Sequence, residues 1–273
     1  FRNLVHWVPY SDSYTHYIHS YPAKLIKHIP IFFLNSNLLL PDSKSIVLDP
    51  FCGSGTVLLE SLLAGHNSIG CDSNPLARLI AKVKTTKLET KRLHDTKIAI
   101  ICKAKRLRKS VPLNVVNVEH WFSDSTIKQL SKLYRAINET CVGDEFDFFM
   151  AAFSSIIKKV SYADPNLSVP VKIKPEKYKN IDTKVKLSNK LIELENIDVM
   201  SVFDNQVNKN LLRVSLLEKA AFGNLSAKVV SKDARQITKS LEPESNLLDS
   251  NSVDFIITSP PYAGAQKYIR SSS

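Results

Sequence analysis

The chain has 273 residues, of which 44% are hydrophobic and 23% are charged, and its formal net charge is +11. This length and apolar content suit one large domain, or one domain that carries an insertion, and they exclude wholesale disorder. No apolar run reaches the roughly 18 residues that a transmembrane helix needs, so no membrane partner is expected. The positive charge indicates either a polyanionic partner such as nucleic acid or a generally basic surface.

The cysteines and the start of the chain bear on its cellular setting. The four cysteines are widely spaced and include no CxxC pair. This spacing argues against a zinc site or a disulfide framework and favours a reducing cytoplasm. Because the chain begins at Phe1 rather than at a methionine and shows no secretory signal pattern, we expect its natural start to lie upstream.

The first recognisable elements are a strand, a glycine-rich turn and a helix. Ser45–Leu48 is predicted to be a short buried strand, and DPFCGSGT (49–56) a tight turn. Val57–Ala64 follows as an apolar helix that Gly65 stops. Four of the seven glycines of the chain fall between residues 53 and 70. Glycine at a strand-to-helix corner lets the backbone approach a ligand closely.

The next elements complete a βαβ unit. Ser68–Cys71 is predicted as a second strand that ends at Asp72, and a helix follows with Pro75 in its first turn. An acidic residue at the tip of the second strand can accept hydrogen bonds from a ribose diol. The unit therefore predicts a site for a nucleoside-bearing cofactor, although its spacing departs from the dinucleotide fingerprint G-x-G-x-x-G. A glycine turn that serves packing alone is the alternative.

Residues 97–225 separate the second and third predicted strands and look mainly helical, since a βαβ crossover requires far fewer residues. Helices are predicted over 124–140 (with Ile127, Leu130, Tyr134 and Ile137 on one face), over 146–161, and over 185–222 as one bent helix or two. Prolines and lysines predict a loop at 163–180. Two basic clusters, KAKRLRK (103–109) and KIKPEKYK (172–179), are candidates for phosphate contact or else solvated faces.

The end of the chain combines a strand with a stiff corner. Val253–Thr258 is predicted to be a strand, followed by Ser259, Pro260, Pro261 and Tyr262. The prolines fix φ, so the Ser259 hydroxyl and the Pro260 carbonyl are held side by side as acceptors. Two such acceptors can grip both hydrogens of an exocyclic amine, while Tyr262 offers a face for a stacked base. A loop with a proline pair and a surface tyrosine is the alternative.

DPFCGSGT resembles the first motif of S-adenosylmethionine-dependent methyltransferases, in the form found in enzymes that methylate amino groups of DNA. The resemblance implies a Rossmann-like α/β core and S-adenosylmethionine as cofactor. The residues that it places around the methionine part of the cofactor are Asp49, Phe51, Gly53, Gly55 and Thr56. Asp72 would then hold the ribose hydroxyls. Asp233, at the end of a third predicted strand in AKVVSKDARQI (227–237), would accept from the adenine amine or else cap a helix.

SPPY resembles the [D/N/S]-P-P-[Y/F/W] motif of enzymes that methylate cytosine N4 or adenine N6. The resemblance implies direct methyl transfer to double-stranded DNA, with a flipped base held by Ser259, Pro260 and Tyr262. The serine favours cytosine N4. Such an enzyme belongs to a prokaryotic cytoplasm, in restriction-modification or host defence, with a restriction nuclease as a further candidate partner. The segment 6–30 resembles an amino-terminal segment that helps cover the cofactor, or it simply packs on the core.

This interpretation divides the chain into a catalytic core, residues 1–96 and 226–273, and a helical insertion, residues 97–225, that is a candidate DNA-recognition region. Only AGAQKYIRSSS remains after the proline corner, whereas a complete sheet of the family has further strands. We therefore expect the core to be incomplete, with the rest supplied by further residues or by a complementary C-terminal chain. The alternatives are an RNA guanine-N2 methyltransferase, which shares the first motif, and a non-catalytic or split subunit that needs a partner chain.

Overall fold

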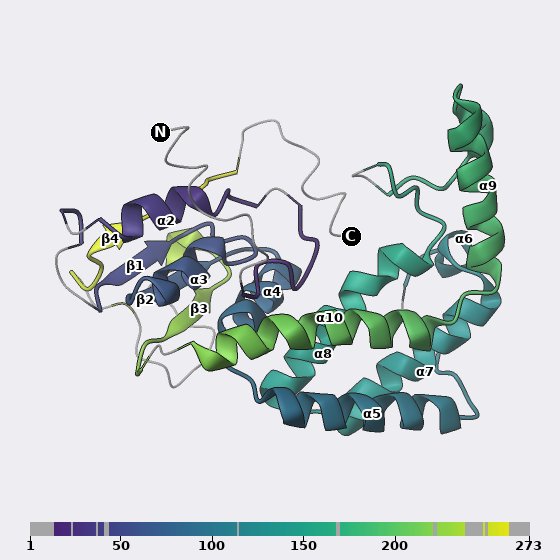
Figure 1. Ribbon diagram of the computed structural model, residues 1–273, viewed down its shortest axis with the longest axis horizontal. Helices are drawn as coiled ribbons and strands as arrows, with labels where there is room; N and C mark the ends of the chain where they lie inside the picture. The colour runs from purple at the N-terminus through teal and green to yellow at the C-terminus, as the bar shows by residue number, and fades with distance from the viewer. Residues whose placement is uncertain are drawn as a thin grey trace. The chain divides into compact units, whose positions relative to one another are not determined.

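The computed structural model describes residues 14–22, 24–36, 38–40, 44–113, 115–167, 170–220, 223–237, 248 and 251–261. These residues form two compact units, shown in Figure 1. One unit contains the described residues of 1–88 and 212–265, and the other contains those of 89–211. The division thus falls after residues 88 and 211, earlier in the chain than the predicted borders at 96 and 225.

The first unit is built on a four-stranded, all-parallel sheet in the order β3-β2-β1-β4. The strands are β1 (Ile46–Asp49), β2 (Asn67–Cys71), β3 (Ala227–Ser231) and β4 (Phe255–Ile256). A parallel sheet needs helices on its faces, which is why the strands alternate with helices along the chain. The predicted α/β class with a parallel sheet is confirmed.

Helices that accompany the sheet include α2 (His28–Leu34), α3 (Thr56–Leu63) and α4 (Pro75–Thr85). One buried cluster joins α2, β1, α3 and the residue after β4, through Leu34, Val47, Val57 and Ile257. α4 begins where predicted, because Pro75 occupies its first position and the Asn74 side chain accepts a hydrogen bond from the Leu76 amide at 2.9 Å. The chain order β1-α3-β2-α4 therefore follows from local signals.

β4 is shorter than the predicted strand over 253–258. Only Phe255–Ile256 has regular strand geometry, but hydrogen bonds to β1 extend one residue beyond it on each side. The Asp254 amide donates to the Ile46 carbonyl at 3.0 Å, and the Ile257 amide donates to the Leu48 carbonyl at 3.1 Å. The segment leading to the proline corner is thus fixed alongside β1.

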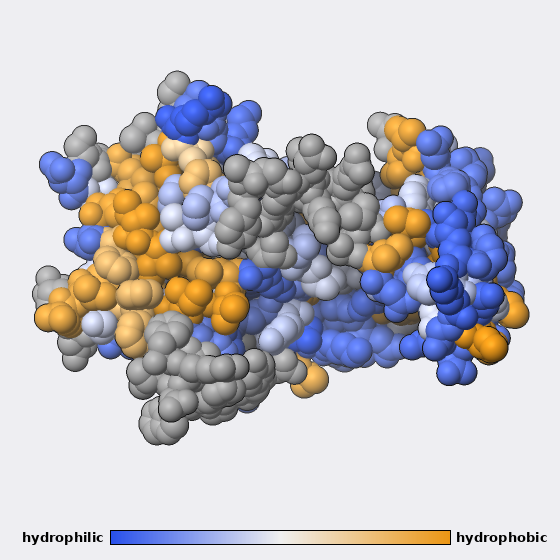
Figure 2. Space-filling view, turned by 90° about the horizontal axis from the view of Figure 1, so that it is seen from above, coloured by the Kyte–Doolittle hydropathy of each residue, from blue (hydrophilic) through white to orange (hydrophobic). Residues whose placement is uncertain are grey.

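Hydrophobic side chains gather on the surface of this unit, as the space-filling view in Figure 2 shows. Ile26, Phe32, Leu38 and Ile256 are among its exposed large hydrophobic residues, and Leu38 is 91% exposed. Single exposed apolar residues are ordinary on protein surfaces, whereas a contiguous group of them indicates an interaction surface.

The second unit is helical. Its helices are α5 (Thr90–Arg106), α6 (Val118–Trp121), α7 (Asp124–Thr140), α8 (Gly143–Ile157), α9 (Ile181–Glu195) and the first part of α10 (Val199–Lys219), with short 3-10 turns η1 (Lys158–Val160) and η2 (Pro175–Lys177). The predicted stretch 185–222 is two helices. The predicted loop 163–180 contains only η2 and one isolated bridge between Ala163 and Lys172 among its described residues. Among the residues that the structure describes, no helix is both long and apolar enough to cross a membrane.

The buried face of α7 differs from the prediction. Leu130 and Ile137 are buried as expected, but Tyr134 is 42% exposed. Leu133 and Ala136 are fully buried instead. The reason is that α7 packs against both α5 and α8, so the buried side of the helix is wider than a single stripe and is rotated away from Tyr134.

Candidate functional site

The glycine-rich turn after β1 is held tightly against the end of β2. The Cys52 amide donates to the Cys71 carbonyl at 2.8 Å, and the Gly55 amide donates to the Cys52 carbonyl at 2.8 Å. Gly53 and Gly55 have φ of +50° and +73°, which side chains with a Cβ adopt only at a cost. The sequence therefore forms this turn because glycine stands at the two left-handed positions.

Gly55 has a packing role in addition to its backbone conformation. A Cβ at this position would lie 2.8 Å from the Ala81 Cβ on α4. Gly55 thus lets the start of α3 approach α4. Gly55 does not line the pocket at the end of β1, whose residues are given below. A Cβ on Gly53 would meet nothing within 4 Å, so the space beside Gly53 is open.

Asp49, the last residue of β1, connects the two motifs. Its Oδ1 accepts a hydrogen bond from the Phe51 amide at 3.1 Å and one from the Thr258 hydroxyl at 2.7 Å. Asp49 is only 3% exposed. Burial raises the pKa of the Asp49 carboxyl to about 6, the negative charge of Asp72 also raises it, and the two hydrogen bonds oppose the rise.

Asp72, directly after β2, connects the glycine turn to the next helix. Its Oδ2 accepts from the Gly53 amide at 2.9 Å, and its Oδ1 accepts from the Asn74 amide at 2.8 Å. A carboxylate oxygen has two lone-pair directions, so each oxygen retains an acceptor site beside the one that is used. Asp72 can therefore order the turn and still accept hydrogen bonds from a ligand.

The strand order places the ends of all four strands along one edge of the sheet. Because the strands are parallel, Asp233, Asp72, Asp49 and Ser259 follow one another along this edge in the order of β3, β2, β1 and β4. Along the chain, β2 and then β3 are added to the sheet on one side of β1, and β4 is added on the other side of β1. The strand order therefore switches at β1. Open α/β sheets bind ligands outside the carboxyl ends of the strands at such a switch point.

A small pocket lies at this switch point. Its lining residues are Lys24, Leu25, Asp49, Phe51, Cys52, Gly53, Ser54, Thr56, Val57 and Ser259. Five of the residues that the sequence singled out therefore meet in one place, four from the glycine turn and one from the proline corner. Ser259 is half-buried, whereas Pro260 and Pro261 are exposed. Tyr262 lies outside the described residues.

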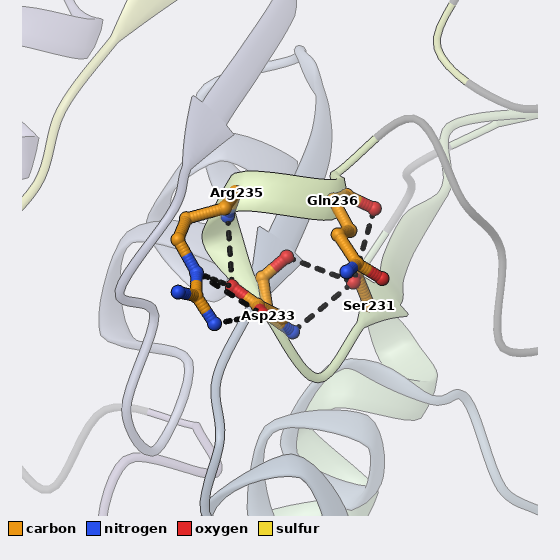
Figure 3. Close-up of polar contacts among 4 residues, drawn as sticks. All are labelled: Ser231, Asp233, Arg235 and Gln236. Atoms are coloured by element: carbon orange, nitrogen blue, oxygen red, sulfur yellow. Dashed lines mark hydrogen bonds and ion pairs between the residues drawn. The ribbon is translucent and has the colours of Figure 1, made fainter.

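Asp233 caps a 3-10 turn, η3 (Ala234–Gln236), as the alternative interpretation predicted. Figure 3 shows its carboxylate accepting from the Arg235 amide at 3.0 Å and from the guanidinium of the same residue, with Nη2 at 2.7 Å. The Arg235 hydrogen bonds hold the pKa of Asp233 low, at about 2. The Ser231 hydroxyl donates to the Asp233 carbonyl at 3.0 Å and so fixes the turn. An adenine amine would share this carboxylate with Arg235.

The sequence assigned no role to several residues at the pocket, among them three with polar side chains. Lys24 and Ser54 line the pocket, and Thr258 bonds to Asp49. Lys24 falls within the segment 6–30. The resemblance of this segment to one that helps cover the cofactor indicated the region but no individual residue. Thr258 directly precedes SPPY, and Ser54 lies inside DPFCGSGT, so only their neighbourhood signalled them.

Each of the two basic clusters of the helical unit has one lysine in a contact and several exposed basic side chains. Lys103 pairs with Glu139 at 3.1 Å, but Lys105, Arg106, Arg108 and Lys109 are exposed at the end of α5 and beyond it. In the second cluster Lys174, Lys177 and Lys179 are exposed, while Lys172 stands over the Tyr162 ring at 5.0 Å. Tyr178 donates to Asp164 and is half-buried, so it supports this loop.

Comparison with known proteins agrees with the geometry. Residues 5–82 match a family model described as DNA methylase. Type II methyltransferase M.MvaI of Kocuria varians is 29% identical over 266 residues, which are 92% of this chain and 54% of that protein. Type II methyltransferase M.MjaII of Methanocaldococcus jannaschii is 32% identical over 126 residues, 46% of this chain and 21% of that protein.

No solved structure matches the chain. The chain spans about half the length of M.MvaI and about a fifth of M.MjaII. The matched segment 5–82 contains the glycine turn, Asp49 and Asp72. Over residues 5–82 the chain is therefore similar to the DNA methylase family, and over most of its length it is similar to a type II methyltransferase.

Proposed function

We propose that this chain transfers a methyl group from S-adenosylmethionine to the exocyclic amine of a flipped base in double-stranded DNA, with cytosine N4 favoured over adenine N6. The observation that carries the proposal is the pocket in which Asp49, Phe51, Gly53 and Thr56 meet Ser259. The names of the two relatives, both type II methyltransferases, favour DNA over RNA and a role in restriction-modification.

The residues at the pocket suit such a cofactor. Gly53 leaves open space beside the turn, Asp49 supplies a buried carboxylate, and Asp72 retains free acceptor directions at the end of the neighbouring strand. When bound, S-adenosylmethionine supplies an electrophilic methyl group on a sulfonium. In this proposal Asp49, Phe51, Gly53 and Thr56 surround the methionine part, Gly55 shapes the turn, Asp72 holds the ribose hydroxyls, and Asp233 meets the adenine amine.

The proline corner would position the target amine. Ser259 and the Pro260 carbonyl accept the two amine hydrogens, Pro261 stiffens the corner, and Tyr262 stacks on the flipped base. The hydrogen bond from Thr258 to Asp49 ties this corner to the cofactor side of the pocket, so amine and methyl donor are aligned by one rigid unit. Alignment of this kind contributes much of the rate in transfers between two bound groups.

The test is transfer of tritium from labelled S-adenosylmethionine to duplex DNA, with tRNA as the competing acceptor. We expect label in DNA, and we expect Ser259→Ala combined with Tyr262→Ala to reduce the rate by at least about a hundredfold, since positioned acceptors contribute on this scale. The same double variant should still bind S-adenosylhomocysteine. An unchanged rate would exclude the proline corner as the amine site, and label in tRNA alone would favour guanine-N2 methylation of RNA.

A chain that binds S-adenosylhomocysteine but methylates neither acceptor would favour the third interpretation, a subunit that needs a complementary chain. Adding the missing partner, or extending the chain to the length of its relatives, should then restore transfer. Sequencing that detects modified bases in DNA from expressing cells distinguishes N4-methylcytosine from N6-methyladenine.

A further inference from the structure

Helix α9 of the helical unit has apolar side chains on two opposite faces. On its inner face Leu187 and Leu194 are buried and pack with Ile173 of the loop that precedes the helix. The exposed apolar residues of α9 are Ile181, Val185 and Ile192, which are 73%, 54% and 67% exposed. A helix needs only one apolar face to pack on its own unit. The second apolar set therefore indicates that the outer face of α9 contacts a partner.

Polar side chains lie among these apolar residues on the outer face. Asn189 follows Val185 by one helical turn, and Ser188 is its neighbour in the chain. Both polar residues are exposed, and neither side chain has a hydrogen-bond partner among the residues that the structure describes. An asparagine amide can bind N6 and N7 of adenine together, and an apolar side chain can contact the methyl group of thymine. The outer face thus carries groups that recognise base edges.

Lysines surround the first part of this face. Residues 172–190 contain seven lysines and only two acidic residues, Glu176 and Asp182. The exposed lysines without an ion pair among the described residues are Lys174, Lys177, Lys179 and Lys186. The two glutamates near the end of α9, Glu193 and Glu195, are already engaged, with Lys190 and with the Tyr162 hydroxyl. This charge distribution complements a polyanion and does not favour an apolar protein surface.

The lysine-bearing loop and α9 form one ordered surface. The Ile173 amide donates to the Tyr162 carbonyl at 2.7 Å, and the Tyr178 hydroxyl donates to the buried Asp164 carboxylate. The Asn180 side chain caps the first turn of α9. α9 itself packs closely on the 3-10 turn η2 of this loop, as can be followed in Figure 1. The surface therefore exists before DNA arrives, which lowers the entropic cost of binding.

We propose that the outer face of α9 lies in the major groove of the DNA substrate and determines its sequence specificity. Val185 and Asn189 contact base edges, and the four exposed lysines contact phosphates on either side. The major groove of B-DNA is about 12 Å wide and admits one α-helix. In several DNA-binding folds the first residues of such a helix contact the bases. This inference rests on the proposed function and names the residues that choose where the methyl group goes.

The experiment separates base recognition from overall affinity. Duplexes that bind the full chain are selected from a library of randomised DNA and sequenced, and fluorescence anisotropy with one unselected duplex measures overall affinity. The variants are Asn189→Ala and Val185→Ala. Asn138→Ala is the matched control, because Asn138 is an exposed asparagine on another helix, α7. Phosphate contacts position a protein on DNA, whereas base contacts give it specificity, so the two readouts report different residues.

We expect Asn189→Ala to reduce the preference of the wild type for adenine at one position by about fivefold to a hundredfold, and to leave the preference at distant positions unchanged. Val185→Ala should reduce a preference for thymine at a nearby position by a smaller factor. Affinity for the unselected duplex should stay within about threefold of the wild type, because the lysines remain. Asn138→Ala should change neither readout.

The inference is wrong if the wild type binds duplexes but enriches no sequence, or if both α9 variants keep the wild-type preference at every position. In either case DNA is still bound and the proposed function stands. An unchanged preference combined with a smaller particle in sedimentation of Val185→Ala would assign the outer face to a contact between copies of the chain. If the wild type binds no duplex DNA, the proposed function fails together with the inference.

Discussion

The Thr258 hydroxyl donates a hydrogen bond of 2.7 Å to Asp49 Oδ1, across a sequence separation of 209 residues. Asp49 belongs to the glycine-turn motif and Thr258 directly precedes the proline corner. This single contact therefore joins the two motifs, and it does so because β4 pairs with β1 and brings both strand ends to the same edge.

Thr258→Val should destabilise the chain by about 1 kcal/mol and reduce methyl transfer more than it reduces binding of S-adenosylhomocysteine. Valine has nearly the shape of threonine but leaves Asp49 Oδ1 with only the Phe51 amide. Urea denaturation and the tritium assay measure the two effects. Thr86→Val is the matched control, since the Thr86 hydroxyl donates to the Lys82 carbonyl within the same turn of α4. Equal effects of the two substitutions on transfer would contradict a link between the motifs.

Gly55→Ala should cost more stability than Gly65→Ala. Both glycines have positive φ, +73° and +91°, so each alanine carries a backbone cost of about 1–2 kcal/mol. Only the Gly55 Cβ would also meet Ala81, at 2.8 Å, which adds about 1–3 kcal/mol of overpacking. Thermal or urea denaturation of the two variants gives the difference. If the two alanines cost the same, the contact between α3 and α4 is not as close as the structure has it.

The free energy of unfolding of Asp49→Asn, relative to that of the wild type, should be higher at pH 7.5 than at pH 4. The folded-state pKa of Asp49, about 6, lies above its usual value of 3.8, so ionisation of Asp49 opposes folding. The cost is absent below pH 3.8, grows as the pH rises and is complete above pH 6, where it reaches about 3 kcal/mol.

Denaturation of Asp49→Asn and the wild type at several pH values gives this difference directly. Asp95→Asn, at an exposed position of α5, serves as the control for the loss of one carboxylate charge. A difference between Asp49→Asn and the wild type that stays constant from pH 4 to pH 7.5 would show that Asp49 is less desolvated than its burial indicates.

Neutralising the exposed lysines and arginines of one basic cluster should weaken binding to all DNA sequences alike. Glutamine at Lys105, Arg106, Arg108 and Lys109 removes four charges, and glutamine at Lys174, Lys177 and Lys179 removes three. The slope of log affinity against log salt concentration is negative, and each lost phosphate contact should reduce its magnitude by about 0.9. Fluorescence anisotropy at several salt concentrations measures the slope. An unchanged slope in both variants would show that the clusters are solvated surfaces that do not contact DNA phosphates.

Local sequence signals predicted the βαβ unit closely. The strands, the turn and the helices between residues 45 and 85 lie within one or two residues of their expected bounds. Glycine at left-handed positions, Asn74 as a cap and Pro75 at the first helical position act within a few residues, so no distant contact is needed to recognise them. The helix face of α7 was predicted less well, because two neighbouring helices decide which of its side chains are buried.

The sequence by itself determined the chemistry that is available: a glycine turn, acids at the strand ends, and a stiff serine-proline corner. Only the tertiary structure decided which of these groups meet. The pairing of β4 with β1 brought Ser259 to Asp49, the packing of α3 on α4 gave Gly55 its role, and the segment before β1 brought Lys24 to the pocket. Each of these depends on contacts between residues far apart in the chain, which periodicity and spacing do not encode.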